Sequence, residues 1–382
     1  MAKTADFFIC GDIINQSTDE QFIDKPIINL IKKCDYSICN FEGTCISKEL
    51  NSGTMLQRSS TLSSLKEAGF NLLLLANNHI TDYGHLGLTD TISQIDQFGF
   101  EHIGAGFQYD DVYRPLIKNI NGLKIGIINL CEAQLGQFKD HNQQYGYAWL
   151  GDFKIDERIQ ALKREVNYVI LIPHAGLENY PIPLNQFRHL YRHWCDVGVD
   201  VIVGGHPHIS QGIEHYKGSI IFYSLGNFFF TGFNDDLESW TAGISCVLHF
   251  ALEGITYDVV QHKMDNSMVY LVNSDINHIV EKNFILSNDS IYLQRLKEQN
   301  AIAFELLPYR LYMSALNGTS SKDSFLTKCK KIIYYLFNRK SLYDGTEKYR
   351  MAVLKRLTEN ETYRFLTISA IEELLGDNYH KL

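Results

Sequence analysis

Residues 72–79 are Leu-Leu-Leu-Leu-Ala-Asn-Asn-His, in which an apolar run is followed directly by three polar side chains. A short, continuous apolar run of this kind predicts a strand, here Leu72–Ala76, with both faces buried. Helical patterns separate this run from similar ones along the chain, and such an alternation predicts an α/β fold. The other runs that predict buried strands are Phe7–Cys10, Tyr36–Cys39, Ile125–Leu130, Tyr168–Ile172, Val199–Val203 and Ile220–Tyr223.

Three stretches place apolar residues at helical spacing and stop at a glycine, a residue that commonly ends helices. These stretches are Leu62–Ala68 before Gly69, Leu88–Phe98 before Gly99, and Leu184–Trp194 before Gly198. Farther along the chain, Ile244–Phe250 and Ile255–Val260 predict a β-hairpin.

After about residue 285, strand patterns give way to helical ones. We therefore expect a first domain over residues 1–270 and a mainly helical C-terminal extension over residues 271–382, which shapes the pocket or an oligomer interface. A basic stretch around Ile332–Phe337 predicts a helix packed on the core, in preference to a membrane-surface helix. The helical patterns are Tyr292–Leu307, Phe325–Phe337, Tyr349–Leu357 and Thr362–Leu375.

The composition is that of an ordinary globular protein, with 45% hydrophobic and 21% charged residues among 382. A formal net charge of -9 argues against nucleic-acid binding. The eight cysteines form no Cys-x-x-Cys pair, which predicts reduced core residues. No run approaches the roughly 20 apolar residues that span a bilayer, and no secretory signal is evident, so we expect no integral membrane association and a cytoplasmic location.

Unusual polar clusters follow the apolar runs. In a mostly parallel sheet the carboxyl ends of the strands lie on one edge, where α/β proteins place their sites. We therefore expect these clusters to form one pocket. They are Gly11-Asp12, Asn40-Phe41-Glu42-Gly43, Ala76-Asn77-Asn78-His79, His174, His206-Pro207-His208 and Gly226-Asn227.

These clusters contain oxygen and nitrogen groups that bind divalent metal ions. Each residue alone has an ordinary explanation: Asp12 can cap a turn, Glu42 can be a solvated carboxylate, and His174 can be a hydrogen-bonded core residue. The His206-Pro207-His208 spacing is more specific, because an extended segment directs alternate side chains to the same side. The expected metal ligands are Asp12, Glu42, Asn78, His174, His206 and His208.

The order of these clusters and the residues in them resemble the motifs of the CapA family of poly-γ-glutamate capsule synthesis proteins, within the calcineurin-like metallophosphoesterase superfamily. The resemblance covers about residues 6–250 and implies a layered β-sandwich flanked by helices. Its further motifs are Asp82-Tyr83-Gly84, Gly104-Ala105-Gly106, Cys131-Glu132, Ala175-Gly176-Leu177-Glu178 and Ser224-Leu225-Gly226-Asn227-Phe228.

The resemblance implies one or two divalent ions, with manganese, zinc or iron expected. Glu42 would bridge two ions; Asn78, His174 and His206 would complete one site, and Asp12 and His208 would help complete the other. His79 and Asp82 are the expected catalytic residues, His79 acting as a proton donor or charge stabiliser that Asp82 orients. The residues expected to contact substrate or to support the ligands are Asn40, Asn77, Glu178 and Asn227.

Two positions depart from the superfamily pattern. Ile14 stands where the superfamily usually has a histidine, and Glu42 stands where it usually has an aspartate. The CapA pattern shares both features, which leave the Asp12 metal site short of ligands. The Asp12 site then binds its metal ion weakly, holds it only transiently, or is completed by a group of the substrate.

Three functions are compatible with this pattern. The leading one is a metal-dependent phosphoesterase acting on an anionic small molecule or polymer. The second is an accessory protein in the synthesis or handling of an acidic polymer such as poly-γ-glutamate or capsule, and the third is a metal-stabilised structural module. Nucleotides, sugar phosphates, lipid-linked phosphates and acidic polymers all offer oxygen ligands, so the sequence does not select the substrate.

Overall fold

The computed structural model describes residues 3–16, 21–46, 55–231, 238–272, 277–309, 312 and 345–375. The chain divides into two compact units, Met1–Asp289 and Ser290–Leu382. The predicted boundary near residue 270 differs from this division by helix α8 (Asn277–Ser287), which contacts β13 of the first unit. The predicted helix Phe325–Phe337 and the basic stretch around it lie outside the described residues.

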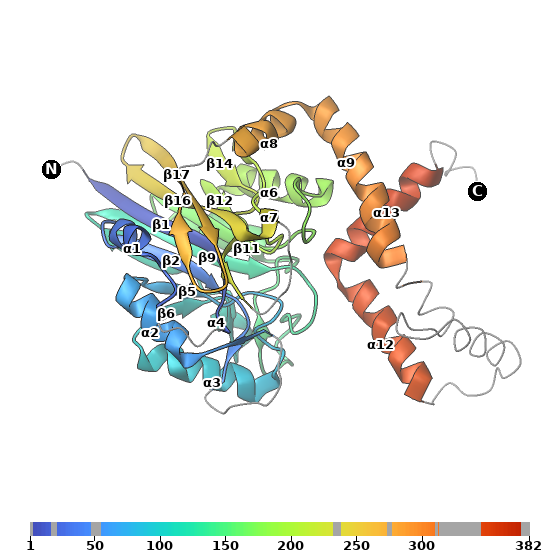
Figure 1. Ribbon diagram of the computed structural model, residues 1–382, viewed down its shortest axis with the longest axis horizontal. Helices are drawn as coiled ribbons and strands as arrows, with labels where there is room; N and C mark the ends of the chain where they lie inside the picture. The colour runs from blue at the N-terminus through green and yellow to red at the C-terminus, as the bar shows by residue number, and fades with distance from the viewer. Residues whose placement is uncertain are drawn as a thin grey trace, which may run out of the picture. The chain divides into compact units, whose positions relative to one another are not determined.

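The first unit contains two large sheets (Figure 1). The larger sheet has eight strands in the order β18-β17-β16-β1-β2-β5-β6, and β15 also pairs with β1. Strands β15, β2, β5 and β6 run parallel to their neighbours, whereas β16 to β18 form an antiparallel edge. The bounds are β1 (Thr4–Ile14), β2 (Tyr36–Phe41), β5 (Leu72–Leu74), β6 (Glu101–Ile103), β15 (Asn227–Phe230), β16 (Ala242–Ala251), β17 (Gly254–Met264) and β18 (Val269–Leu271).

The second sheet has six strands in the order β13-β14-β12-β11-β9-β8. Its four central strands are parallel, and β8 and β13 pair antiparallel at the two edges. The bounds are β8 (Leu116–Ile120), β9 (Leu123–Cys131), β11 (Tyr168–His174), β12 (Val201–Val203), β13 (Ile213–Tyr216) and β14 (Ser219–Phe222).

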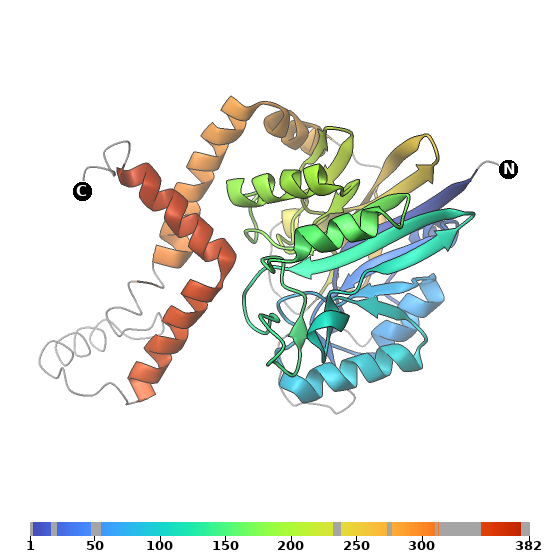
Figure 2. The same cartoon turned by 180° about the vertical axis from the view of Figure 1, so that it is seen from behind.

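Strand β1 shows how the sequence builds the layers, because successive side chains of a strand point to opposite faces. Phe7 and Ile9 join the core that contains residues of both sheets, whereas Phe8 and Cys10 join the core under the helices of the first sheet. Helices α1 (Lys25–Ile31), α2 (Ser59–Ala68) and α3 (Gly84–Gln97) cover that face. Figure 2 shows α5 (Ile155–Lys163) and α6 (Asn185–Val197), both in green, lying against the second sheet.

The α/β class and the two stacked sheets flanked by helices are therefore confirmed. So are the expected strands, the hairpin of β16 and β17, and the helical stops at Gly69, Gly99 and Gly198. The second unit is helical where it is described, and no helix of the described residues is long and apolar enough to cross a membrane. The remaining elements are β3 (Thr44–Cys45), β4 (Leu56–Gln57), β7 (Ala105–Gly106), β10 (Gly146–Tyr147), α4 (Tyr109–Val112), α7 (Glu238–Thr241), α9 (Asp289–Phe304), the π-helical turn η1 (Glu305–Tyr309), α12 (Gly345–Glu359) and α13 (Glu361–Leu375).

Strand β1 approaches the backbone just before β15 closely at Gly11. The register between β1 and β2 shifts from Cys10 to Asp12, and the Asp12 amide donates to the Gly226 carbonyl at 3.3 Å. A Cβ added at Gly11 would lie 1.8 Å from that carbonyl oxygen. Such irregularities redirect side chains near sites, and here the glycine permits the one that places Asp12.

We predict that Gly11→Ala lowers the free energy of unfolding by roughly 2–4 kcal/mol, because the new methyl group must displace the backbone at Gly226. Urea unfolding followed by circular dichroism measures this change. Gly106→Ala is the matched control, since its nearest neighbour would be a Val112 methyl group at 3.4 Å. Equal stabilities for the two variants would contradict the prediction.

Candidate metal centre

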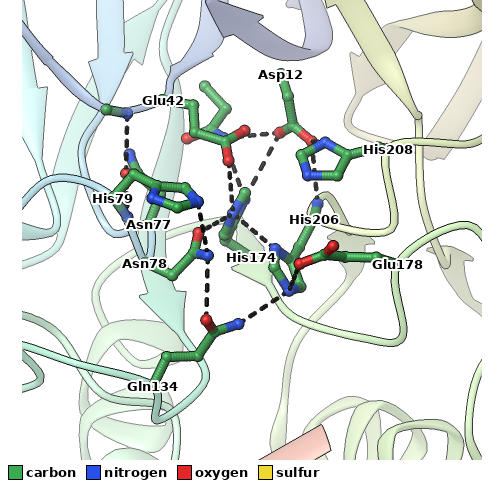
Figure 3. A network of polar contacts seen from close by, with 12 residues as sticks. Asp12, Glu42, Asn77, Asn78, His79, Gln134, His174, Glu178, His206 and His208 are labelled. Carbon is green, nitrogen blue, oxygen red and sulfur yellow. Dashed lines mark hydrogen bonds and ion pairs between the residues drawn. The ribbon is translucent and has the colours of Figure 1, made fainter. Parts of the chain in front are cut away.

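The predicted site residues come from the strand ends of both sheets. Asp12 lies on β1 and Glu42 follows β2, whereas His174 ends β11 and His206 follows β12. The expectation of a single sheet edge was therefore wrong. The sandwich stacks the two sheets so that both sets of carboxyl ends face one region, and Figure 3 shows the side chains converging there.

Glu42 is the most unusual group in this region. Its side chain is fully buried, and neither carboxylate oxygen has a hydrogen-bond partner among the residues that the structure describes. A buried carboxylate that lacks hydrogen bonds is strongly unfavourable unless a positive charge compensates it. Glu42 therefore fits a cation.

Three potential ligand atoms surround Nε2 of His174. Asn78 Oδ1 and His206 Nδ1 each lie 3.1 Å from it, and Glu42 Oε1 lies at 3.7 Å. Ligands bound at about 2.1 Å in a tetrahedral metal site lie roughly 3.4 Å from one another. The distances from His174 Nε2 to these three atoms are therefore close to those between ligands of one metal ion.

Asp12 connects the two sheets. Its Oδ1 accepts from the Asn40 amide at 2.7 Å, its Oδ2 accepts from the His206 backbone N–H at 3.2 Å, and His208 Nδ1 lies 3.4 Å from Oδ2. Asp12, Glu42 and His174 place potential ligand atoms within 4.8 Å of one another, as do Glu178, His206 and His208.

Asn227 orients His208. Its Nδ2 donates to the Trp240 carbonyl at 3.3 Å, which turns its Oδ1 toward His208 Nδ1 at 3.0 Å. Because an amide oxygen only accepts, His208 carries a proton on Nδ1 in this contact. The other ring nitrogen, Nε2, is then the one suited to a metal, as in sites where a further partner fixes the histidine ring.

The charges in the site are strongly coupled. Burial raises the pKa of Glu42 well above its usual value, and the Asp12 charge adds to this effect. Burial opposes ionisation of Asp12 too, but contacts with His174 and His208 outweigh it and hold the Asp12 pKa well below normal. Burial lowers the pKa of His174 and His206, which favours the neutral imidazole that binds metals.

His208 behaves differently. Burial lowers its pKa, but the negative charges of Glu42 and Asp12 outweigh burial and raise the pKa to about 9. In the absence of a metal ion, a proton on His208 therefore neutralises part of this negative charge. The site attracts positive charge.

The backbone at His206-Pro207-His208 is not the extended segment that the spacing predicts. His206 has φ 90° and His208 has φ 60°, both in the region that favours glycine. The residues follow β12 in a tight bend, and the bend, not strand alternation, brings both rings to the site with centroids 5.8 Å apart. Backbone strain of this kind costs about 1–3 kcal/mol per residue and typically occurs at functional sites.

His79 and Asp82 lie at the rim of the site. Their side chains are 23% and 30% exposed, and His79 Nδ1 lies 2.7 Å from Asp82 Oδ2. His79 Nε2 lies 3.1 Å from the Asn78 amide nitrogen. Asn77 instead fixes the loop itself, since its amide binds the Phe41 carbonyl and its oxygen accepts from the Gly43 and His79 backbone.

Sequence reasoning missed three buried or partly buried side chains of β9 and the segment after it. Gln134 accepts from Asn78 at 3.2 Å and approaches His206 Nε2 at 3.1 Å, while it donates to Glu132 at 2.9 Å. Asn129 accepts from the Ala76 N–H at 2.8 Å. The signal for Asn129 was its polar side chain within an apolar strand, and Glu132 occurs in a quoted motif; no feature of the sequence marks Gln134.

The fold and the site define a class: an α/β sandwich with a buried cluster of carboxylate, amide and imidazole groups suited to divalent metal ions. Residues 6–232 match the family described as bacterial capsule synthesis protein PGA_cap. The chain belongs to this family.

Two relatives show the extent of this similarity. The chain is 31% identical over 242 residues to a capsule biosynthesis protein CapA of Bacillus anthracis, a match that covers 60% of this chain and 57% of that protein. It is 30% identical over 240 residues to a PGA biosynthesis protein CapA of Bacillus subtilis (strain 168), covering 60% and 62%. The chain thus spans less than two thirds of the length of these relatives.

Similarity to solved structures is lower. A hypothetical protein from Thermus thermophilus aligns with 12% identity and a TM-score of 0.43, covering 68% of this chain and 100% of that chain. A 5'-nucleotidase precursor from the same organism aligns with 13% identity and a TM-score of 0.41, covering 68% and 54%. The family assignment rests on the sequence match.

We predict that removing metal with a chelator lowers the melting temperature of the wild-type protein, because it leaves Glu42 buried without a compensating charge. In Glu42→Gln the same treatment should cause a much smaller drop. Thermal unfolding with and without chelator measures both changes. Glu253→Gln, at the exposed tip of the β16–β17 hairpin, is the control that should respond like wild type. An unchanged chelator response in Glu42→Gln would contradict the role assigned to this carboxylate.

Proposed function

We propose that this protein is a metal-dependent hydrolase and that its reaction is phosphoester hydrolysis. The observation that carries the proposal is the buried Glu42 carboxylate, which has no hydrogen-bond partner in the described part of the chain and lies beside three other potential ligand groups. A hydrolytic site also needs a proton donor near these groups, and His79 supplies one at the rim.

Asp12, Glu42, Asn78, His174, His206 and His208 would hold one or two ions. When bound, divalent ions polarise a phosphoryl oxygen and lower the pKa of a coordinated water. The protein's own contribution is to hold six donor groups at or just beyond the strand ends of two sheets, so that the substrate meets a preformed arrangement.

His79 is suited to proton transfer. Asp82 accepts a hydrogen bond from Nδ1, which fixes the ring and leaves Nε2 as the nitrogen that exchanges a proton with a leaving oxygen. Its partial exposure lets the ring reach a substrate, whereas the six proposed ligands are almost fully buried. The proposed metal ligands are therefore buried, whereas the proposed proton donor is partly exposed.

A second candidate function is accessory work in the synthesis or handling of an acidic polymer such as poly-γ-glutamate. The names of the two CapA relatives favour it. The two functions differ in outcome: a polymer-handling protein binds or transfers poly-γ-glutamate without releasing phosphate from esters.

We predict that the purified protein contains or acquires manganese, zinc or iron and not calcium, since three imidazoles favour borderline cations over hard ones. Metal analysis by mass spectrometry measures this. Stoichiometric calcium with none of these transition metals would contradict the ligand assignment.

We predict that, with manganese added, the wild-type protein hydrolyses chromogenic phosphomonoesters or diesters. His79→Ala should lower turnover by about 10²- to 10⁴-fold, because general-acid assistance is typically worth that much. Its metal content should stay near that of wild type. Glu42→Ala should instead lose metal from both positions, and Asp12→Ala or His208→Ala should lose the ion at the Asp12 position first.

His85→Ala is the matched control for His79→Ala, because His85 is an exposed histidine on α3 that contacts Phe107 and Tyr145. It should keep wild-type turnover. If His79→Ala strips metal as severely as Glu42→Ala, His79 is a ligand. Absence of turnover in the wild type, with any metal and either ester, would count against the hydrolase proposal and in favour of polymer handling.

A further inference from the structure

The loop that follows β11 is held firmly against the histidine bend. The Ala175 amide donates to the Gly205 carbonyl at 3.1 Å, and the Asn179 amide donates to the Pro207 carbonyl at 2.9 Å. These bonds lie on either side of Glu178. Its backbone is therefore fixed relative to His206 and His208, unlike that of a freely moving surface carboxylate.

The Glu178 side chain points toward these histidines (Figure 3). Its Oε1 lies 3.8 Å from His206 Nε2, and Glu178, His206 and His208 offer ligand atoms within 4.8 Å of one another. The side chain is 48% exposed, whereas both histidines are buried. Glu178 thus stands where solvent meets the buried cluster.

The cluster that Glu178 faces contains the buried carboxyl groups of Asp12 and Glu42. Glu42 is fully buried there, and no described residue makes a hydrogen bond to either of its oxygens. The side-chain contacts of Asp12, Glu42 and Glu178 within the described residues are to imidazole and amide groups. Three carboxylates so arranged repel one another unless cations lie among them.

Ile14 explains why a further ligand is needed. The related superfamily pattern has a histidine at this position, but the Ile14 side chain is fully buried in the core under the helices. It offers no donor atom. The Asp12 and His208 position therefore lacks one protein ligand that the pattern would supply.

We propose that Glu178 is a direct metal ligand and takes the place of that missing group. It forms, with His208 and the Nε2 side of His206, a second cation position on the solvent side of the site, and His208 joins this position to Asp12. This assignment rests on the metal-binding part of the proposed function. It also gives the second ion an exposed carboxylate, so that this ion exchanges more readily than the one beside His174.

The competing role for Glu178 is to accept a hydrogen bond from His206 Nε2 and so orient that ring. Glu178→Gln separates the two roles, because the amide keeps an acceptor oxygen near His206 but removes the negative charge that a metal ligand provides. The matched control is Glu157→Gln, an exposed carboxylate on α5.

The experiment is a titration of the metal-free full chain with Mn²⁺, followed by calorimetry and by electron paramagnetic resonance of coupled manganese pairs. We expect two ions per wild-type chain. In Glu178→Gln we expect the first ion to bind as in wild type, the second to bind at least tenfold more weakly, and the coupled signal to disappear at equal metal concentration. Glu157→Gln should match wild type.

Two results would overturn the assignment: two ions bound by Glu178→Gln with wild-type affinities, or a single ion in the wild type that the substitution leaves unchanged. Ester hydrolysis is measured in parallel. A wild-type protein that binds two ions, loses one through Glu178→Gln and hydrolyses no ester would refute the phosphoesterase function while confirming Glu178 as a ligand.

Discussion

Two carboxylates buried between the ends of two sheets impose the main constraint on this structure. Asp12 and Glu42 are both fully buried, and burial alone makes their ionised forms unfavourable. Asp12 is stabilised by an amide, a backbone N–H and two imidazoles, whereas Glu42 has no hydrogen bond within the described ranges of the chain. The surrounding histidines and loops are arranged to satisfy one carboxylate and to leave the other for a cation.

A side-chain contact between the two sheets also positions one loop of the site. Asn129 belongs to the second sheet, where its amide donates to the Ile172 carbonyl, and its oxygen accepts from the Ala76 N–H in the loop that follows β5 of the first sheet. Gly104 makes room for this contact, since a Cβ there would lie 2.2 Å from the Asn129 oxygen. The loop that carries Asn78 and His79 is therefore positioned by a strand that contributes none of the proposed ligands.

Much of the fold could be predicted from the sequence because it depends on local signals. Apolar runs such as Leu72–Ala76 and glycines such as Gly69 and Gly198 mark where strands lie and helices end. The residues that meet at the site were also predictable, because each lies near or just after the carboxyl end of an apolar strand. The division of those strands between two sheets was not, since pairing depends on contacts distant in sequence, and neither was Gln134, whose contacts with Asn78 and His206 exist only in the folded chain.

The bend at His206 and His208 has a consequence for how this protein can be changed. Two non-glycine residues there occupy a backbone conformation that glycine or asparagine adopts at lower cost. Replacing either histidine by glycine would relieve strain and remove a buried imidazole at once. Because His208 also lies against the buried Asp12 carboxylate, glycine at that position would leave this charge less compensated, so backbone strain and charge compensation cannot be improved independently in this segment.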